Sequence, residues 1–395
     1  MRLAHLADLH LGRVFHANSL VEDQAYALAQ VLDVLRRDGV DAVLLAGDLY
    51  DRALPGREAV RLLDWFLREV NESLGLPVVA IAGNHDSADH LGFGAWMFRR
   101  ENLHVRGRMD PAAAPVRFAD AHGPIDVYPL PYVEPEAARE WLVAAGDADA
   151  AGSVTHRDTV RAMLRHARSQ RAERPGVRAV TLCHAFVEGD RHPDESPRSE
   201  RSLYLGGVGA ALARDFEGFA YTALGHLHRP QSLTADGGVR YSGSLLKYAF
   251  DEVDHDKGFT VVDLDAEGRC RVEHRSITPR RDLARIAGEL ESLLHRDDLT
   301  PMEGCFVSAE ITDHPPPLQA MERLRARFPY AAELRFRALE LELPALDGLD
   351  AHRTARDPAE VFEAFFARET GAPPDDSQRA VFHEALLAAR EGEAS

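Results

Sequence analysis

The N-terminal part of the chain alternates short apolar runs with longer amphipathic stretches. Apolar runs occupy residues 1–7, 41–46 and 78–82, whereas residues 22–37 and 57–74 carry apolar side chains at every third or fourth position. The runs have the length of buried strands, and the stretches between them have the period of helices. This order of strand, helix, strand, helix and strand predicts a parallel sheet with right-handed crossovers.

Further strand-length apolar runs continue to residue 277. A helix is expected near residues 156–171, and residues 187–201 form a polar, proline-containing segment that is too long for an ordinary connection. Strands are expected at residues 125–130, 178–183, 219–224, 239–244, 258–263 and 270–277. The last three are expected to close a second β layer, which predicts an α/β fold with two β layers and flanking helices.

The pattern changes near residue 278. A helix to about residue 295, a strand at 306–311, a helix at 318–327 and a strand at 333–336 predict a compact α+β unit.

The last stretch of the chain carries two amphipathic helical segments, around residues 361–366 and 381–387, separated by Gly371-Ala372-Pro373-Pro374. Phe362, Phe365 and Phe366 are most simply core residues, and a docking face for a partner helix is the alternative. We therefore expect three parts, at residues 1–277, 278–345 and 346–395.

Polar side chains of a few types follow five of the predicted strands. They form the motifs Asp8-x-His10, Gly47-Asp48-x-x-Asp51, Gly83-Asn84-His85-Asp86, a lone His184 and Gly225-His226-x-His228. Because ligands gather beyond the carboxyl ends of parallel strands, these side chains are expected to lie close together. The candidate metal ligands are Asp8, His10, Asp48, Asn84, His184, His226 and His228.

The candidate ligands combine carboxylate, amide and imidazole groups. Such a set suits Mn²⁺, Fe²⁺ or Zn²⁺ better than Ca²⁺ or Mg²⁺, which prefer oxygen ligands alone. Seven side chains are too many for one tetrahedral site and suit two adjacent ions, the arrangement that hydrolyses phosphate esters. Asp48, which follows the central strand, is the natural bridge between the ions. Taken singly, a histidine at a strand end is more often a packing residue, and Gly-Asp is more often a turn or a helix cap. Their convergence on one sheet edge favours a metal centre.

His85 and Asp86 are the candidate catalytic residues. Because neighbouring side chains leave the backbone in different directions, His85 is expected to face the substrate while Asn84 faces the metal. It would act as a general acid to the leaving oxygen or as a cationic clamp on the phosphate. Asp86 is expected to hold the His85 ring by a hydrogen bond. Asp51 stays open between a supporting role and a solvated residue before the next helix.

The charge balance changes the expected mode of binding. A formal net charge of -18 argues against a free-standing, high-affinity nucleic-acid binder, whose surface is usually basic. If the substrate is nucleic acid, a metal ion or a partner must supply much of the attraction. No apolar run reaches membrane-spanning length. Cys183, Cys270 and Cys305 lie too far apart for a disulfide framework or a thiolate zinc site, which fits a reducing cytosol.

Taken in order, the motifs resemble the signature of the calcineurin-like metallophosphoesterases. The region after residue 278 is similar to the capping domain of a narrower group, the SbcD family, the nuclease subunits of bacterial SbcCD DNA-repair complexes. Sequence blocks similar to that family are MRLAHLADLHLGRVF, AGDLYDRALP, AGNHDS, GHLHRPQ and YSGSLLKYAFDE. The resemblance covers nearly the whole chain and is weakest over residues 110–170 and at the C-terminal end.

The resemblance implies a two-layered β-sandwich flanked by helices and a dinuclear centre, with Mn²⁺ as the expected activating metal. His85 would be the catalytic histidine, dispensable for metal binding. Bacterial members carry Asp where archaeal and eukaryotic relatives commonly carry His, so no catalytic role passes to Asp51. One ion would be held by Asp8, His10, Asp48 and His228, and the other by Asp48, Asn84, His184 and His226.

The resemblance also implies partners. Members form homodimers through helices of the phosphoesterase domain, for which residues 57–74 and 89–100 are the candidates here. The C-terminal helices would dock on the coiled-coil root of the ATPase SbcC and give a heterotetramer. Much of the DNA-binding surface would then belong to the assembled complex. The expected location is cytoplasmic, associated with the nucleoid.

Three functions are open at this point. The leading one is a Mn²⁺-dependent DNA nuclease for ends and hairpins, a double-strand exonuclease and single-strand endonuclease gated by an ATPase. The second is a small-molecule phosphodiesterase or nucleotidase, against which the additional domain after residue 278 speaks. The third is a non-catalytic scaffold for DNA ends, against which the complete set of candidate ligands speaks.

Overall fold

The fold is described from a computed structural model of the chain. It describes residues 1–99, 102–109, 114–144, 155–189, 192–200 and 210–337, together with short runs between 362 and 386. Residues 1–338 form one compact unit, and residues 339–395 form a second. Among the described residues, no helix combines the length and the apolar character needed to cross a bilayer.

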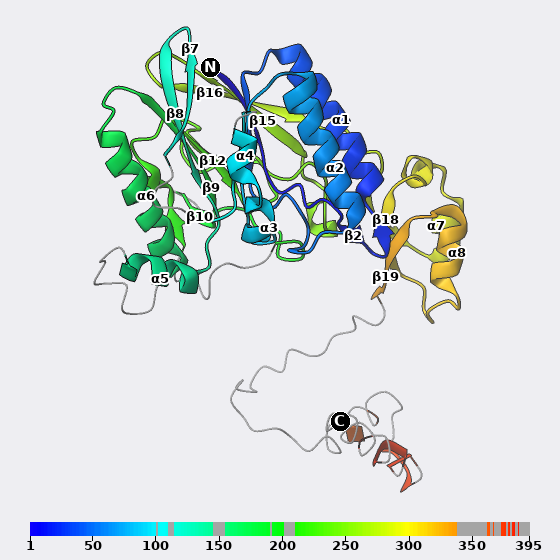
Figure 1. The fold of residues 1–395 in the computed structure, drawn as a ribbon. Helices are drawn as coiled ribbons and strands as arrows, with labels where there is room; N and C mark the ends of the chain where they lie inside the picture. The colour runs from blue at the N-terminus through cyan, green and yellow to red at the C-terminus, as the bar shows by residue number, and fades with distance from the viewer. Residues whose placement is uncertain are drawn as a thin grey trace. The chain divides into compact units, whose positions relative to one another are not determined.

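The first sheet has six strands and carries the predicted strand–helix alternation. Across the sheet these are β16 (Cys270–Ser276), β15 (Gly258–Leu264), β1 (Arg2–Leu6), β4 (Ala42–Ala46), β5 (Val78–Ile81) and β6 (Leu103–Arg106). The strands from β1 to β6 run parallel, and β15 pairs antiparallel with both β1 and β16. Helices α1 (Val21–Asp38) and α2 (Arg57–Arg68) lie side by side against this sheet (Figure 1), and a π-helical turn extends α2 to Ser73.

The continuous apolar runs are explained by burial on both faces of this sheet. Alternate side chains of a strand point to opposite faces. Leu45 packs with the helices α1 and α2, whereas its neighbour Leu44 packs between the two sheets. In the same way, Val78 packs on the helix side of the sheet and Val79 packs between the two sheets. A polar residue within these runs would therefore be buried whichever way it pointed.

The second sheet also has six strands. They are β13 (Gln231–Ser232), β14 (Val239–Tyr241), β12 (Tyr221–Gly225), β9 (Arg178–His184), β8 (Gly123–Leu130) and β7 (Val116–Asp120). Helices α5 (Pro135–Ala144) and α6 (His156–Ala172) belong to this half, and α6 begins with a capping box between Thr155 and Asp158. Val127, Val180 and Tyr221 pack against the first sheet, which closes the sandwich.

The expected two-layered sandwich with flanking helices is confirmed, with one correction. Residues 258–263 and 270–277 were expected in the second β layer, but they form β15 and β16 at the edge of the first sheet. The register pairs Arg2 with Asp263 and His5 with Thr260. β15 is buried on both faces and would have the same apolar pattern in either sheet, so the sequence pattern did not show to which sheet it belongs, and β16 follows β15 as its hairpin partner.

A smaller unit follows the sandwich. Its parallel three-stranded sheet consists of β17 (Leu283–Gly288), β18 (Phe306–Ile311) and β19 (Ala331–Phe336), with α7 (Leu290–His295) and α8 (Ala320–Arg327) packed on it. The helix expected to run to residue 295 is therefore partly wrong, because residues 283–288 form a strand. Pairing along β18 outweighs the local helical pattern there.

The smaller unit is fastened to helix α1. The guanidinium of Arg281 donates to the buried carboxylate of Asp23 at 2.9 Å and lies over the rings of Phe306 and Tyr330. Phe15 contacts Phe306 edge to face, with 5.3 Å between ring centroids. Short elements complete this part of the chain: β2 (Val14–Phe15), β3 (Asn18–Ser19), α3 (Ala88–Gly92), α4 (Ala95–Phe98), β10 (Val187–Glu188) and β11 (Ala211–Leu212).

The C-terminal unit is described only in part. Residues 362–363 and 381–383 are helical, and the rings of Phe362 and Phe382 stack with 4.1 Å between centroids. Phe362 also contacts Phe366. Residues 361, 365, 371, 372 and 387 of the expected segments and their connection lie outside the described residues.

Candidate metal centre

The structure brings all seven candidate ligands to one edge of the sandwich. Asp8, Asp48 and Asn84 follow the carboxyl ends of strands β1, β4 and β5 of the first sheet. His184 ends β9 and His226 follows β12 in the second sheet. The candidate ligands of the second sheet therefore meet those of the first, as the contact between His184 and Asn84 shows. All are buried except Asn84, which is half-buried.

The ligands fall into two neighbouring groups. In one, the Nε2 atoms of His10 and His228 lie 3.1 Å apart, and both rings are close to Asp8. In the other, Asn84 Oδ1 lies 2.9 Å from His184 Nε2 and 3.3 Å from His226 Nδ1.

Asp48 lies between the two groups. Its Oδ2 atom is 3.6 Å from His10 Nε2 and 3.5 Å from His184 Nε2. The position agrees with a carboxylate shared between two cations.

Each aspartate uses one oxygen for the protein and turns the other to the centre. Asp8 Oδ1 accepts a hydrogen bond from the His226 amide, and Asp48 Oδ1 accepts one from the His85 amide, both at 2.9 Å. Asp8 Oδ2 is buried and has no hydrogen-bond partner among the described residues. A buried oxygen of this kind is costly unless another partner, such as a cation, satisfies it.

Burial shifts the pKa values of the candidate ligands in the direction that favours their neutral forms. Burial raises the pKa of the Asp8 and Asp48 carboxyls above their usual range. It lowers the pKa of His184 to about 4 and that of His226 well below its ordinary value, so both imidazoles are neutral. Neutral imidazoles have a lone pair to offer, and a bound cation would favour the ionised carboxylates.

The contact between His184 and Asn84 agrees with this fit. His184 Nδ1 lies 2.9 Å from the Ala46 carbonyl, which only accepts, so Nδ1 carries the proton. His184 Nε2 is then an acceptor, and it faces the acceptor Asn84 Oδ1 at 2.9 Å. Two lone pairs at this distance repel each other, and either a cation between them or rotation of the Asn84 amide, whose Nδ2 has no partner among the described residues, removes the repulsion. The residues present therefore fit divalent metal ions.

The backbone at the centre is strained. Asp8, His10 and Asp48 have φ angles of 54°, 44° and 50°, and His226 has a φ angle of 115°. These four candidate ligands make up half of the eight non-glycine residues with positive φ in the described chain. Such conformations cost about 1–3 kcal/mol each and persist where surrounding contacts impose them, often at functional sites.

Two motif glycines allow the loops to meet. A Cβ at Gly83 would overlap the Asp48 carboxylate, and a Cβ at Gly225 would overlap the Ala46 carbonyl and approach His184 Nδ1. The glycines in the Gly-Asn-His-Asp and Gly-His-x-His motifs are thus required by close approach of neighbouring strand ends.

His85 lies at the margin of the centre. It is half-buried, and its ring contacts His10 edge to face with 4.7 Å between centroids. Its Nδ1 atom lies 2.9 Å from the backbone carbonyl of Asp51, so Nδ1 donates and Nε2 remains for proton transfer.

Asp86 has a different role from the one expected. Its carboxylate accepts hydrogen bonds from the amides of Leu49 and Tyr50, at 3.1 and 2.9 Å, and from the amide of Gly83 at 2.9 Å. The expected bond to the His85 ring is replaced by the Asp51 carbonyl. Asp86 ties the loops after β4 and β5 together, since backbone amides at both loops need an acceptor. Burial raises its pKa to about 7.

Sequence reasoning missed the residues that surround His228. Glu252 Oε1 lies 3.1 Å from His228 Nδ1, Glu200 Oε1 accepts from the His228 amide at 2.6 Å, and Lys257 Nζ donates to the His228 carbonyl at 2.7 Å. Glu200 belongs to the long polar segment at 187–201. The block YSGSLLKYAFDE, which ends with Glu252, was the one available signal for Glu252, and Lys257 lies beyond it.

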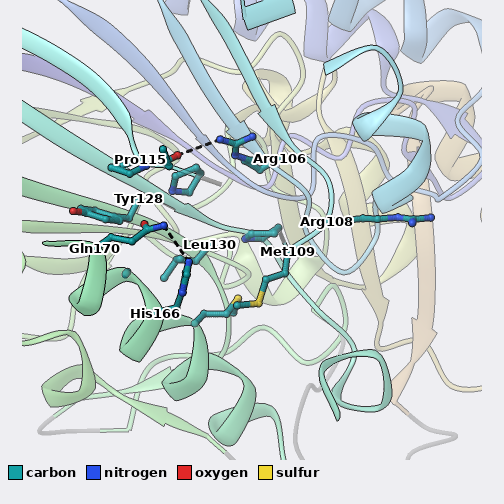
Figure 2. Close-up of a pocket in the computed structure, with 13 residues that line it drawn as sticks. Arg106, Arg108, Met109, Pro115, Tyr128, Leu130, His166 and Gln170 are labelled. Carbon is teal, nitrogen blue, oxygen red and sulfur yellow. Dashed lines mark hydrogen bonds between the residues drawn. The ribbon is translucent and has the colours of Figure 1, made fainter. Parts of the chain in front are cut away.

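Two cavities differ in their relation to the centre. One of about 440 Å³ lies beside Asn84 and Asp86 and is walled by Met109 and Tyr132. The other, between β8 and α6, holds only about 30 Å³, room for one or two water molecules. Figure 2 shows that Arg108 points away from this smaller cavity, where His166 and Gln170 contact each other. Of these two cavities, the one beside Asn84 is the one with room for part of a substrate.

Known proteins match most of the chain. A model described as calcineurin-like phosphoesterase matches residues 1–230, and one described as the type 5 capsule protein repressor C-terminal domain matches residues 279–370. The chain is 29% identical over 296 residues to the D subunit of the nuclease SbcCD from Staphylococcus epidermidis, covering 74% of each chain. It is also 29% identical to the corresponding SbcCD nuclease protein of Staphylococcus saprophyticus, covering 74% of this chain and 73% of the relative.

A solved structure of a dimetal phosphatase from Danio rerio is more distant. It has a TM-score of 0.39 and 15% identity, and the match covers 71% of this chain and 97% of that one. A TM-score this low supports no conclusion. The family is shown instead by the first family model, which matches more than half of the chain. The chain therefore belongs to the calcineurin-like phosphoesterase family and is a metal-dependent phosphoesterase.

Proposed function

We propose that the chain is a Mn²⁺-dependent DNA nuclease of the SbcCD type, a double-strand exonuclease and a single-strand and hairpin endonuclease. It would work in DNA repair and recombination with the ATPase SbcC. One observation carries the proposal: seven buried or half-buried ligands form two groups around Asp48, with His85 beside them. The relatives named as SbcCD nuclease subunits point to DNA as the substrate.

The ligands divide between two proposed ions. Asp48 is common to both, since its Oδ2 lies nearly equally far from His10 and His184. When bound, the two ions supply a hydroxide from water and neutralise charge on the phosphoryl oxygens. The mixed nitrogen and oxygen donors favour Mn²⁺ over Mg²⁺. The first set is Asp8, His10, Asp48 and His228, and the second is Asp48, Asn84, His184 and His226.

The protein's own contribution to cleavage centres on His85. The Asp51 carbonyl accepts the Nδ1 proton of its ring, so the imidazolium form of His85 would carry a second proton on Nε2 and give that proton to the leaving oxygen. The ring is half-buried and not engaged in either ligand set, so it can meet the substrate. The larger cavity beside Asn84 gives room for the nucleotide next to the reacting phosphate.

We expect His85→Ala to keep both ions and to lose about 10²–10⁴-fold in the rate of DNA cleavage, the usual contribution of a positioned acid. Metal content would be measured by Mn²⁺ titration and cleavage on linear duplex and hairpin DNA. His16→Ala, a change at a histidine outside the ligand groups, is the matched control and should keep the full rate. Full nuclease activity in pure His85→Ala protein would remove this assignment.

The direct test of the function is cleavage of linear duplex and hairpin DNA by the purified chain with Mn²⁺, against EDTA and Mg²⁺. A small chromogenic phosphodiester would be assayed alongside. Mn²⁺-dependent DNA cleavage supports the nuclease. Turnover of the small ester with intact DNA, even after addition of SbcC and ATP, would favour a small-molecule phosphodiesterase. Absence of any hydrolysis would favour a non-catalytic scaffold.

We propose a homodimer formed through α2 and the α3–α4 region. Apolar side chains are exposed on both: Trp65 is 37% exposed, Phe93 79% and Trp96 67%. Such a patch on one protein usually marks an interaction surface. Light scattering of the double variant Phe93→Ser and Trp96→Ser should give a monomer, and an unchanged dimer would contradict this interface.

We propose that residues 278–345 cap the nuclease and control access of DNA ends, and that residues 346–395 dock on SbcC. The described part of the cap is held to α1 through Arg281 and Asp23, and the neighbouring Gln24 donates to the His10 carbonyl. The stacked Phe362 and Phe382 rings support a paired helical segment for docking. Removal of residues 346–395 should abolish binding to SbcC in a pull-down while nuclease activity on its own persists.

A further inference from the structure

His228 is held at every polar atom except the one that faces the centre. Its amide donates to Glu200 at 2.6 Å, and its carbonyl accepts from Lys257 Nζ at 2.7 Å and from the Ser244 amide at 3.1 Å. Its Nδ1 atom lies 3.1 Å from Glu252 Oε1. Only Nε2 remains, and it lies 3.1 Å from His10 Nε2.

Glu252 is placed to receive hydrogen bonds on both oxygens. Oε1 meets His228 Nδ1 and accepts from the Ser199 hydroxyl. Oε2 accepts from the Tyr248 amide at 3.0 Å and from Lys257 Nζ at 2.7 Å. Glu252 is fully buried and Lys257 is 4% exposed, so this ion pair is enclosed in the protein. The surroundings suit a carboxylate.

A carboxylate at Nδ1 determines what Nε2 can do. An imidazole whose Nδ1 proton goes to a carboxylate has its lone pair on Nε2. The carboxylate also raises the basicity of the ring and holds its orientation. Both effects strengthen the binding of a cation to Nε2.

We propose that Glu252, held in place by Lys257, is a positioning residue that directs His228 Nε2 to the ion of the Asp8–His10–His228 group. The inference rests on the proposed function, because it requires an ion in that group. Glu252 belongs to neither ligand set, and it touches the centre only through His228.

If the ion pair of Glu252 and Lys257 served only to stabilise the fold, the expected effect of removing it would be different. A buried ion pair can stabilise the fold only weakly, because desolvation offsets the attraction between the charges. If Glu252 served only the fold, its removal would lower stability and leave the metal affinity of the folded protein unchanged. Metal affinity therefore separates the two roles.

The test is Mn²⁺ titration by calorimetry of full-length wild type and Glu252→Gln. Glutamine has the same shape, but its NH₂ group must face either Lys257 and Tyr248 or His228 and Ser199. In the first orientation, the NH₂ group faces two other donors, Lys257 Nζ and the Tyr248 amide. In the second, the NH₂ group donates to His228 Nδ1, so the ring proton moves to Nε2 and Nε2 can no longer bind a cation. We expect one of the two sites to bind about 10–100-fold more weakly while the other is unchanged, the usual effect of losing such a partner.

Glu200→Gln is the matched control. Glu200 contacts the same histidine through the backbone amide and not through the ring, and glutamine keeps an acceptor for that bond. Its Mn²⁺ affinities should equal those of the wild type. An equal loss in both variants would overturn the proposal, because it would show general sensitivity of this region.

The double variant Glu252→Gln and Lys257→Met guards against misfolding, since it leaves no lone buried charge. It should show the same weakening at one site. Wild-type affinity at both sites in both Glu252 variants would overturn the inference alone. Failure of the wild type to bind Mn²⁺ would instead overturn the proposed function, and the inference with it.

Discussion

The two halves of the metal centre support their histidines in different ways. In one half, Nδ1 of His228 meets the carboxylate of Glu252 at 3.1 Å. In the other, Nδ1 of His184 donates to the backbone carbonyl of Ala46 at 2.9 Å. A carboxylate carries a full charge and increases ring basicity more than a carbonyl does. We expect the His228 half to hold its ion more tightly.

The two halves also differ in enclosure. In the His228 half, four further residues contact His228, namely Ser199, Glu200, Tyr248 and Lys257. The His184 half includes half-buried Asn84, which borders the cavity of about 440 Å³. If the proposed ions bind, the ion at His228 would be enclosed by more side chains than the ion at Asn84, which would border the cavity.

The largest expected effect is that of Asp48→Ala, which should abolish tight metal binding in both halves and with it the difference between their affinities. Asp48 contacts both groups, so its loss should weaken Mn²⁺ binding at both sites. The loss at each site should exceed about 100-fold, the largest loss usual for a residue that only supports a ligand. Nuclease activity should be lost with the ions. Calorimetric titration measures the effect, and Asp33→Ala, at an exposed carboxylate on α1, is the control. Retention of two bound ions would contradict the bridging role.

A smaller effect should separate the halves. His228→Ala and His184→Ala are each expected to remove one ion, because each residue belongs to one group. Since the His228 half should bind first, His228→Ala should abolish the tighter phase and His184→Ala the weaker one. Loss of the same phase in both variants would show that the halves are not independent.

The smallest expected effect concerns support from α1. Gln24 donates to the carbonyls of Leu9 and His10, at 3.2 and 2.7 Å, and accepts from the Gly12 amide at 3.0 Å. Gln24→Ala should cost about 1–3 kcal/mol of unfolding free energy, because buried carbonyls lose their donor. Urea denaturation measures this, with Asp33→Ala, at an exposed side chain of the same helix, as the comparison. Equal stability of the two variants would remove this role.

Much of the fold and the ligand identities could be predicted because local pattern determines them. The apolar runs before Asp8, Asp48 and Asn84 predicted buried strands, and the rule for parallel sheets placed their ends together. His184 and His226 joined them because their strands end at the same edge of the second sheet.

What the sequence could not predict depends on long-range contacts. The place of β15 in the first sheet comes from its pairing with β1, more than 250 residues away. Asp86 was assigned to His85 by adjacency, but amides from the loop after β4 come closer. Glu252 and Lys257 follow His228 with no spacing that marks them, and only the folded chain brings them to its ring.

The most direct test of the account is a crystal structure of the full chain soaked in Mn²⁺, with anomalous difference density to locate the ions. We predict two peaks. One should touch Asp8, His10 and His228, the other should touch Asn84, His184 and His226, and Asp48 should contact both. A single peak, or two peaks without a shared Asp48, would contradict the paired centre.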